Sequence, residues 1–103
     1  MTNIWKINDM IAVQTGSVVS RTLFNQKSGT LTLFAFDAGQ SLSEHTAPFD
    51  AFAQVLEGQL EIRIDGEAHV LSAGEMILMP ANLPHALVAQ TPAKVLLTML
   101  RAN

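Results

Sequence analysis

The sequence predicts a small all-β domain, and three observations indicate this fold class. No segment repeats its apolar residues at the spacing of an α-helix. Turn-forming pairs such as Asp65-Gly66 recur every several residues along the chain. The stretches between the turns are short and rich in Val, Ile, Leu, Phe and Thr. Short strands separated by regular turns are typical of a small antiparallel β-barrel or sandwich.

Outside the hairpin described below, three stretches are expected to form strands, and the N-terminal stretch is ambiguous. The first dozen residues are ambiguous, because Trp5, Ile7 and Ile11 fit either a strand or a short helical turn over the barrel. Residues 18–24 are expected to be a strand. Residues 30–36 and 94–100 show little polar alternation, which indicates strands covered on both faces. The second cover could come from another subunit.

The clearest local pattern is a β-hairpin over residues 59–71. Leu60, Ile62 and Ile64 alternate with polar residues, as in a strand with one wet face. Asp65-Gly66 provides the two central residues of a type I′ turn, which requires positive φ at both positions. The chain is then expected to return as the second strand of the hairpin.

Length and composition predict one domain that associates with a second copy. A chain of 103 residues is the size of a single domain, here residues 1–103. The sequence is 49% hydrophobic and only 15% charged, against a usual charged content of about 25%. The excess apolar surface favours a subunit interface, so we expect a homodimer.

Several classes of partner and site are disfavoured. The net charge is −3 and the six basic residues are scattered, so we expect no nucleic acid partner. The absence of cysteine excludes disulfides and thiolate metal sites. The first ten residues do not resemble a signal peptide, and no apolar run approaches the roughly 20 residues that span a bilayer. We therefore expect a cytoplasmic protein with no membrane partner.

Two segments that each begin at a glycine each contain one histidine. His45 lies in the first segment, residues 39–58, and His85 lies in the second, residues 74–89. Two imidazoles are a reasonable beginning for a divalent metal site. They are too few for the four ligands of a structural zinc site or the usual three of a catalytic one.

The two segments resemble the paired motifs of the cupin family. The first cupin motif has Gly, five residues, His, one residue, His, three or four residues, Glu, six residues and Gly, and the second has Gly, five residues, Pro, one residue, Gly, two residues, His, three residues and Asn. The residues that match this spacing are Gly39, His45, Gly58, Gly74, Pro80 and His85. Asn82 replaces the second glycine of the second motif and is expected to adopt positive φ, whereas Ala89 replaces its final Asn. The resemblance implies a double-stranded β-helix of the jelly-roll type.

The departures from these motifs affect the implied metal site. Metal-binding cupins use two histidines and a glutamate of the first motif and one histidine of the second. Here Ala47 and Ala51 stand at two of those positions, so only His45 and His85 remain. We therefore expect no tightly bound cofactor, with one divalent transition metal on these histidines as the alternative. By strand alternation, Asp50 and Gln54 point away from the site and could substitute only if a bulge re-aimed them.

Three functions follow from this interpretation. The favoured one is a non-enzymatic protein that binds a small organic ligand, acidic or aromatic, at a site lined by His45, His85, Phe49, Asp50, Phe52 and Met79. The second is a cupin enzyme, either dependent on a divalent metal or metal-free, in which His45 or His85 acts as general base. Oxygenases, decarboxylases, isomerases and epimerases belong to this class, and no catalytic residue is assigned. The third is a structural or partner-binding domain with an inert barrel.

Overall fold

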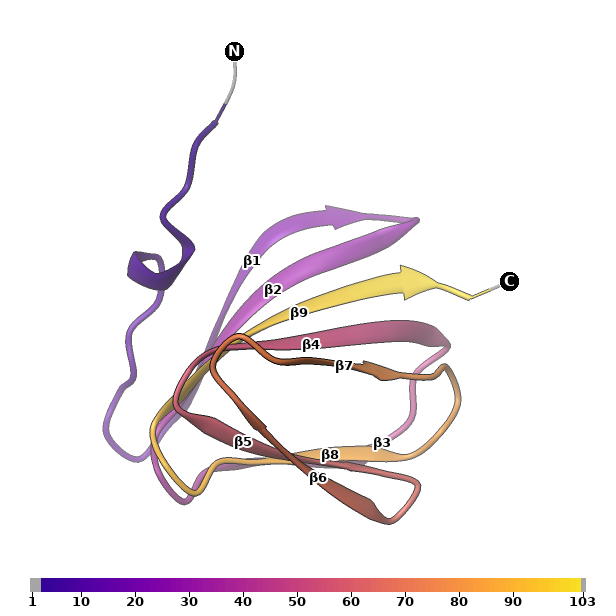
Figure 1. Cartoon of the computed structure of the whole chain (residues 1–103). Helices are drawn as coiled ribbons and strands as arrows, with labels where there is room; N and C mark the ends of the chain where they lie inside the picture. The colour runs from indigo at the N-terminus through magenta and orange to yellow at the C-terminus, as the bar shows by residue number, and fades with distance from the viewer. Residues whose placement is uncertain (1–2, 103) are drawn as a thin grey trace.

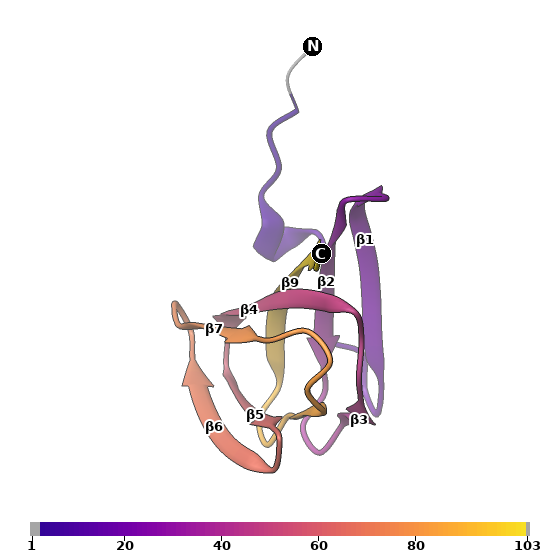
Figure 2. The ribbon, with the colours of Figure 1, turned by 90° about the vertical axis from the view of Figure 1, so that its right-hand side faces the viewer.

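The computed structural model describes residues 3–102, which form two antiparallel sheets that face one another (Figure 1). One sheet has the strand order β1-β2-β9-β4-β7 and the other has the order β3-β8-β5-β6. Figure 2 shows the two layers curving toward each other like the walls of a barrel. The all-β prediction is thereby confirmed. The strands are β1 (Val18–Gln26), β2 (Gly29–Phe36), β3 (Ser41–His45), β4 (Phe49–Glu57), β5 (Gln59–Ile64), β6 (Glu67–Ser72), β7 (Met76–Met79), β8 (His85–Val88) and β9 (Ala93–Arg101).

The hairpin predicted over residues 59–71 is formed by β5 and β6. Leu60 and Ile62 are fully buried, whereas Glu67 at the start of β6 is exposed. Asp65 has φ 51° and Gly66 has φ 83°, as a type I′ turn requires. The apolar alternation of β5 therefore fixes which of its faces turns toward the other sheet.

A core of apolar side chains fills the space between the two sheets. Alternate residues of β4 and β8 point inward, and the same holds for β5. Burial of these side chains is the main favourable contribution to folding. The buried members of this core are Phe36, Ala51, Ala53, Val55, Leu60, Ile62, Leu71, Met79, Leu87, Ala89 and Val95.

The N-terminal segment covers one end of the outer face of the five-stranded sheet. It contains the short 3-10 helix η1 (Ile7–Asp9), followed by Ile11, which packs against Leu33 and Ala35 of β2. The short helical turn, one of the two forms expected there, is the one observed. Within residues 3–102, no helix has the length and hydropathy needed to cross a membrane.

Two polar contacts hold this segment on the sheet. Lys94 of β9 donates from Nζ to the carbonyl oxygen of Asn8 at 2.7 Å, and Arg21 of β1 donates from Nη1 to that of Met10 at 3.0 Å. The strands 30–36 and 94–100 are therefore covered on their second face at one end by their own chain.

The glycine at the β4–β5 corner is predicted to be essential for stability. Gly58 has φ 74°, and a Cβ there would collide with the carbonyl oxygen of Pro92. Gly39 has φ 84°, but a Cβ there would meet nothing within 4 Å. Gly39→Ala should lower the free energy of unfolding by about 1–2 kcal/mol, the cost of left-handed backbone. Gly58→Ala should cost about 1–3 kcal/mol more, because backbone atoms must also move. Urea denaturation of both variants checks this difference, and equal losses would contradict it.

Candidate functional site

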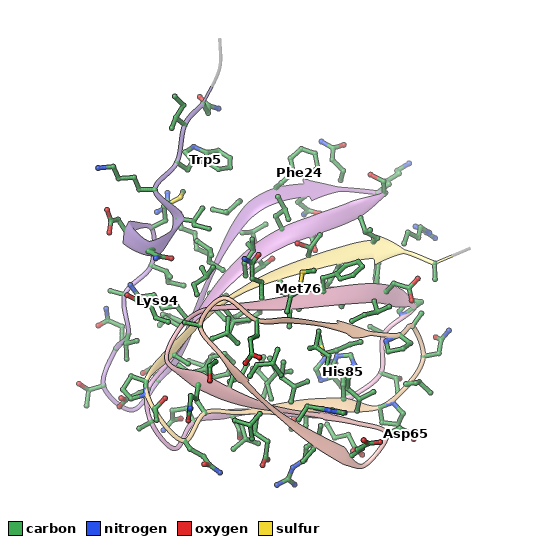
Figure 3. All side chains as sticks on the ribbon, in the orientation of Figure 1. Trp5, Phe24, Asp65, Met76, His85 and Lys94 are labelled. Atoms are coloured by element: carbon green, nitrogen blue, oxygen red, sulfur yellow. The ribbon has the colours of Figure 1, made fainter. Side chains whose placement is uncertain are left out.

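Pairing of β3 with β8 brings the two predicted histidines together. His45 and His85 are register partners on these antiparallel strands. Their ring centroids lie 4.4 Å apart with the ring planes at 68°, an edge-to-face arrangement. His85 is only 7% exposed, whereas His45 is exposed. Figure 3 shows His85 between the two sheets, toward the end where β3 leads into β4.

A β-bulge in β3 places His45 opposite His85. Leu42 pairs with Leu87, but the next pair is His45 with His85, so β3 contains one residue more than β8 over this stretch. In a regular ladder the partner of His85 would be Glu44. An extra residue re-aims the side chains that follow it. The pair of imidazoles therefore depends on this irregularity as well as on the two motifs.

Backbone carbonyls fix the tautomer of both rings. His45 Nδ1 lies 2.8 Å from the carbonyl oxygen of Ser43, and His85 Nδ1 lies 3.3 Å from that of Leu83. Because a carbonyl oxygen can only accept, each Nδ1 must donate its proton there. In the neutral rings the lone pair is then on Nε2, which is the atom open to a ligand.

Burial is the main influence on the charge of His85. Desolvation lowers the pKa of His85 below its usual value of 6.5, and the neighbouring His45 lowers it further by charge repulsion. The hydrogen bond to the carbonyl of Leu83 acts in the opposite direction. The neutral form of His85 is therefore favoured at pH 7.

The start of β4 and the loop before it are joined to the turn that leads into β8. Asp50 accepts a hydrogen bond at Oδ1 from the backbone N–H of Ala81 at 2.9 Å. The N–H of Asn82 donates to the carbonyl oxygen of Ala47 at 2.9 Å. Asn82 has φ 68°, which confirms the positive φ predicted where the family has glycine. Asp50 thus fastens the turn that leads into His85.

The other predicted ligand-binding residues lie in different surroundings. Alternation along β4 places Phe49 on the inner side, directly after the loop, where it is half-buried. Met79 is enclosed in the core at 1% exposure. Phe52 and Gln54 pair with Leu78 and Met76, and alternation places all four on the outer face of the five-stranded sheet. The structure therefore gathers His45, His85 and Phe49 at one end and places Phe52 and Gln54 on the opposite face of the sheet, whereas Met79 lies on the inner side of β7 opposite Ala51.

The residues present do not provide a full metal coordination sphere. Ala47 and Ala51 have no donor atoms, and Ala51 is buried in the core. Within the described part of the chain there is no group of three or more His, Cys, Asp or Glu side chains placed to hold a metal ion. Two imidazole nitrogens are fewer than the three protein ligands usual in a catalytic zinc site.

Sequence reasoning missed the bulge in β3 and the structural role of Asp50. It also missed two hollows on the outer surface. One, of about 250 Å³, is lined by residues of β1, β2 and β9, and the other, of about 340 Å³, lies beside the N-terminal segment and Leu56. The apolar residues that line the first hollow were the sequence signal available for it.

The lowered pKa of His85 predicts a pH-dependent stability. His85 binds a proton more tightly in the unfolded chain than in the folded one. Its contribution to the free energy of unfolding is therefore fully present above pH 6.5. It is lost progressively as the pH falls from 6.5 through the pKa of the folded state. The melting temperature should therefore fall between pH 7.5 and 5, and His85→Gln should reduce that fall. His69→Gln is the control and should keep the wild-type slope; an unchanged slope in His85→Gln would contradict the assignment.

Loss of the Asp50 side chain should destabilise the turn before His85. Asp50→Ala leaves the N–H of Ala81 without its acceptor in a half-buried place, which should cost about 1–3 kcal/mol. Glu44→Ala removes an exposed carboxylate from β3 and should change stability by less than about 0.5 kcal/mol. Urea denaturation gives both values, and amide hydrogen exchange at Ala81 should accelerate in Asp50→Ala only. Equal protection of Ala81 in the two variants would rule out the anchoring role.

Comparison with known proteins agrees with this geometry. A solved conserved protein of unknown function, SPY1581 from Streptococcus pyogenes, is 31% identical, with all of this chain and 90% of that chain covered and a TM-score of 0.93. The cupin 2 conserved barrel domain protein from Leptotrichia buccalis is 32% identical over 94% of this chain and 47% of that one, with a TM-score of 0.92.

A curated relative, the polyketide synthase CurC from Streptomyces cyaneus, is 36% identical over 59 residues. The match includes 56% of this chain and 38% of that protein, so the chain spans well under half the length of this relative. The family model described as Cupin domain matches residues 32–99, more than half of the chain. The resemblance inferred from the two motifs is thus confirmed, and this chain belongs to the cupin-domain family.

Proposed function

We propose that this cupin-domain protein binds a small organic ligand on His45 and His85, without a tightly bound metal. The observation that supports this most is the shared geometry of the two rings. Both donate from Nδ1 to a backbone carbonyl and leave Nε2 for a ligand, with the rings only 4.4 Å apart. The ligand approaches from the exposed side of His45, because the opposite side of His85 borders the core.

The chemistry of two adjacent imidazoles favours an acidic ligand. Charge repulsion from His45 adds to burial in lowering the pKa of His85, so a positive charge at this place is disfavoured. A carboxylate or an acidic hydroxyl beside the rings offsets that repulsion and accepts charge-assisted hydrogen bonds from Nε2–H. The half-buried ring of Phe49 at the same end offers an apolar contact to the rest of the molecule. Binding is then coupled to proton uptake.

The name of one relative helps to choose the compounds for a test. CurC is named a polyketide synthase, and that name belongs to a protein of which this chain spans only 38%. This partial similarity to a protein named a polyketide synthase is the reason that we include aromatic acids among the candidate ligands.

A metal-free acid–base enzyme is the second candidate. One observation favours it: burial favours the neutral form of His85 at pH 7, and the hydrogen bond from its Nδ1 to the carbonyl of Leu83 leaves the lone pair on Nε2. A neutral imidazole with a free lone pair is suited to accept a proton from a bound substrate, as an isomerase or epimerase requires. Asp50, the carboxylate next to Ala51, already accepts a hydrogen bond from the N–H of Ala81 and serves as an anchor.

Ligand binding can be tested with an untagged protein and a panel of acetate, pyruvate, benzoate and salicylate. An acid present at ten times its Kd should stabilise the fold by about 1.4 kcal/mol and raise the melting temperature by about 5–10 °C. The shift should be larger at pH 6 than at pH 8, because a charge-assisted hydrogen bond to the acid requires a protonated ring. The His45→Ala, His85→Ala double variant should remain folded and lose the shift, whereas His69→Ala should keep it.

Two results would contradict the proposal. If every acid gives the same small shift with the wild type and the double variant, the pair is not a binding site and the barrel is inert. If the purified protein retains one equivalent of zinc, manganese or iron after dialysis, and loses it in the double variant, the site is a metal centre. Turnover of a bound acid would assign the enzymatic alternative. It is measured as the loss of an α-proton of the acid in deuterated water.

A further inference from the structure

Strand register places four side chains of the four-stranded sheet in one row. His45 pairs with His85 across β3 and β8, and His85 pairs with Ile64 across β8 and β5. Ile64 in turn pairs with Glu67 across β5 and β6. Directly opposite residues of antiparallel strands lie on the same face of a sheet, and Ile64 packs against the core between the sheets. We call these four residues, which are on the face toward the other sheet, the cross-strand row.

The chemistry of the cross-strand row changes from one edge of the sheet to the other. Two imidazoles lie at one edge, the half-buried side chain of Ile64 lies in the middle, and the carboxylate of Glu67 lies at the other edge. The side chain of Glu67 is 79% exposed, so a ligand can reach it. His69 Nε2 lies 3.9 Å from Glu67 Oε1, and this contact is an ion pair only when the ring of His69 is protonated. The neutral ring leaves the carboxylate available.

A backbone hydrogen bond holds the two parts of the row together. The N–H of Asp65 donates to the carbonyl oxygen of Pro84 at 2.8 Å, and Pro84 directly precedes His85. Asp65 belongs to the type I′ turn that connects Ile64 to Glu67. Figure 3 shows Asp65 and His85 toward the same end of the molecule. The turn that leads to the carboxylate is therefore fastened to the strand that carries the buried imidazole.

Charges at this end of the sheet distinguish a simple acid from an acid that also carries a cation. Glu44, Asp65 and Glu67 are all exposed there. The single Lys or Arg of β3, β5, β6 and β8 is Arg63, and it forms an ion pair with Glu61 at 2.9 Å on the opposite face. The exposed carboxylates oppose a purely anionic ligand and favour one with an added positive charge.

We propose that the acid bound by the histidine pair is an amino acid, whose ammonium group lies at Glu67 and whose methylene chain lies over Ile64. This inference rests on the proposed binding of an acid at His45 and His85. The carboxylate of the ligand accepts a hydrogen bond from Nε2–H of a protonated ring, and its ammonium group donates to the carboxylate of Glu67. Ile64 supplies an apolar surface between the two charged ends.

The spacing of the strands determines which amino acids fit. His85 and Glu67 are two strands apart, so their backbones are separated by roughly 10 Å. Side chains stand roughly perpendicular to a sheet, so their charged groups keep about this separation. Each charge-assisted hydrogen bond takes about 2.8 Å, which leaves roughly 4–5 Å between the charged ends of the ligand. A γ-amino acid spans this distance, whereas an α-amino acid is too short.

Matched pairs of compounds test the proposal on the whole chain. The pairs are acetate with glycine, propionate with β-alanine, and butyrate with γ-aminobutyrate, each titrated at pH 7 and low ionic strength by NMR. We define the gain as the Kd of the acid divided by the Kd of its amino acid. The gain should rise with chain length and reach up to about fivefold for γ-aminobutyrate, because an exposed ion pair contributes little more. High salt should reduce it.

Two variants assign the gain to one carboxylate. Glu67→Gln should abolish the gain while it retains the binding of butyrate. Glu44→Gln is the matched control, because Glu44 is an exposed carboxylate adjacent to His45 but outside the cross-strand row, and it should keep the gain. The same NMR spectra show that both variants remain folded.

The outcomes separate this inference from the function on which it rests. A gain that survives in Glu67→Gln, or that is equal for the three chain lengths, overturns the proposal. If butyrate and γ-aminobutyrate bind equally well, and both are lost in the His45→Ala, His85→Ala double variant, the histidine pair binds acids but Glu67 has no part in it. If no acid and no amino acid binds, the acid-binding function and the amino acid ligand are both wrong.

Discussion

Backbone pairing between the two histidine-containing segments is the constraint on which this structure depends. At one end, the N–H of Gly39 donates to the carbonyl of Ala89 at 2.7 Å, and the N–H of Ala89 donates to the carbonyl of Gln40 at 2.9 Å. At the other end, the N–H of Gly74 donates to the carbonyl of Val55 at 2.8 Å. Between these points β3 pairs with β8 and β4 pairs with β7. The two segments therefore run as one antiparallel ribbon that passes from the four-stranded sheet into the five-stranded one.

The site lies where this ribbon changes sheets. Each segment must turn a corner there, and the corners are joined by Asn82 with Ala47 and by Ala81 with Asp50. Regular pairing stops at a corner, so side chains can face a partner across the ribbon and solvent at the same time. His45 occupies that position, exposed to solvent and opposite the buried His85. The alanines at two family ligand positions leave the imidazoles as the polar groups from which a binding function can be built.

The sequence predicted most of the scaffold because its signals were local. Alternation in β5 and the Asp65-Gly66 pair determine the hairpin through nearest neighbours alone, and motif spacing was sufficient to pair His45 with His85. The bulge in β3 could not be predicted, because Ser43 and Glu44 are ordinary polar residues in an exposed strand. To place Phe52 or Met79, one must know the register between β4 and β7 and the face of the sheet that each residue occupies. Both depend on tertiary structure and not on the local sequence. The cover of β2 and β9 by the N-terminal segment is likewise a long-range contact.

The extra residue in β3 also bears on how such a site can change over evolutionary time. Deletion of Ser43 alone would leave one residue between Leu42 and His45, so a regular ladder would still place His45 opposite His85. If instead the bulge were lost while Ser43 and Glu44 both remained, the register after Leu42 would shift by one residue, and Glu44 would replace His45 as the partner of His85. The position of one extra backbone residue thus separates a site of two bases from an acid–base pair on the same scaffold. Such an exchange of chemistry alters no side chain of the core.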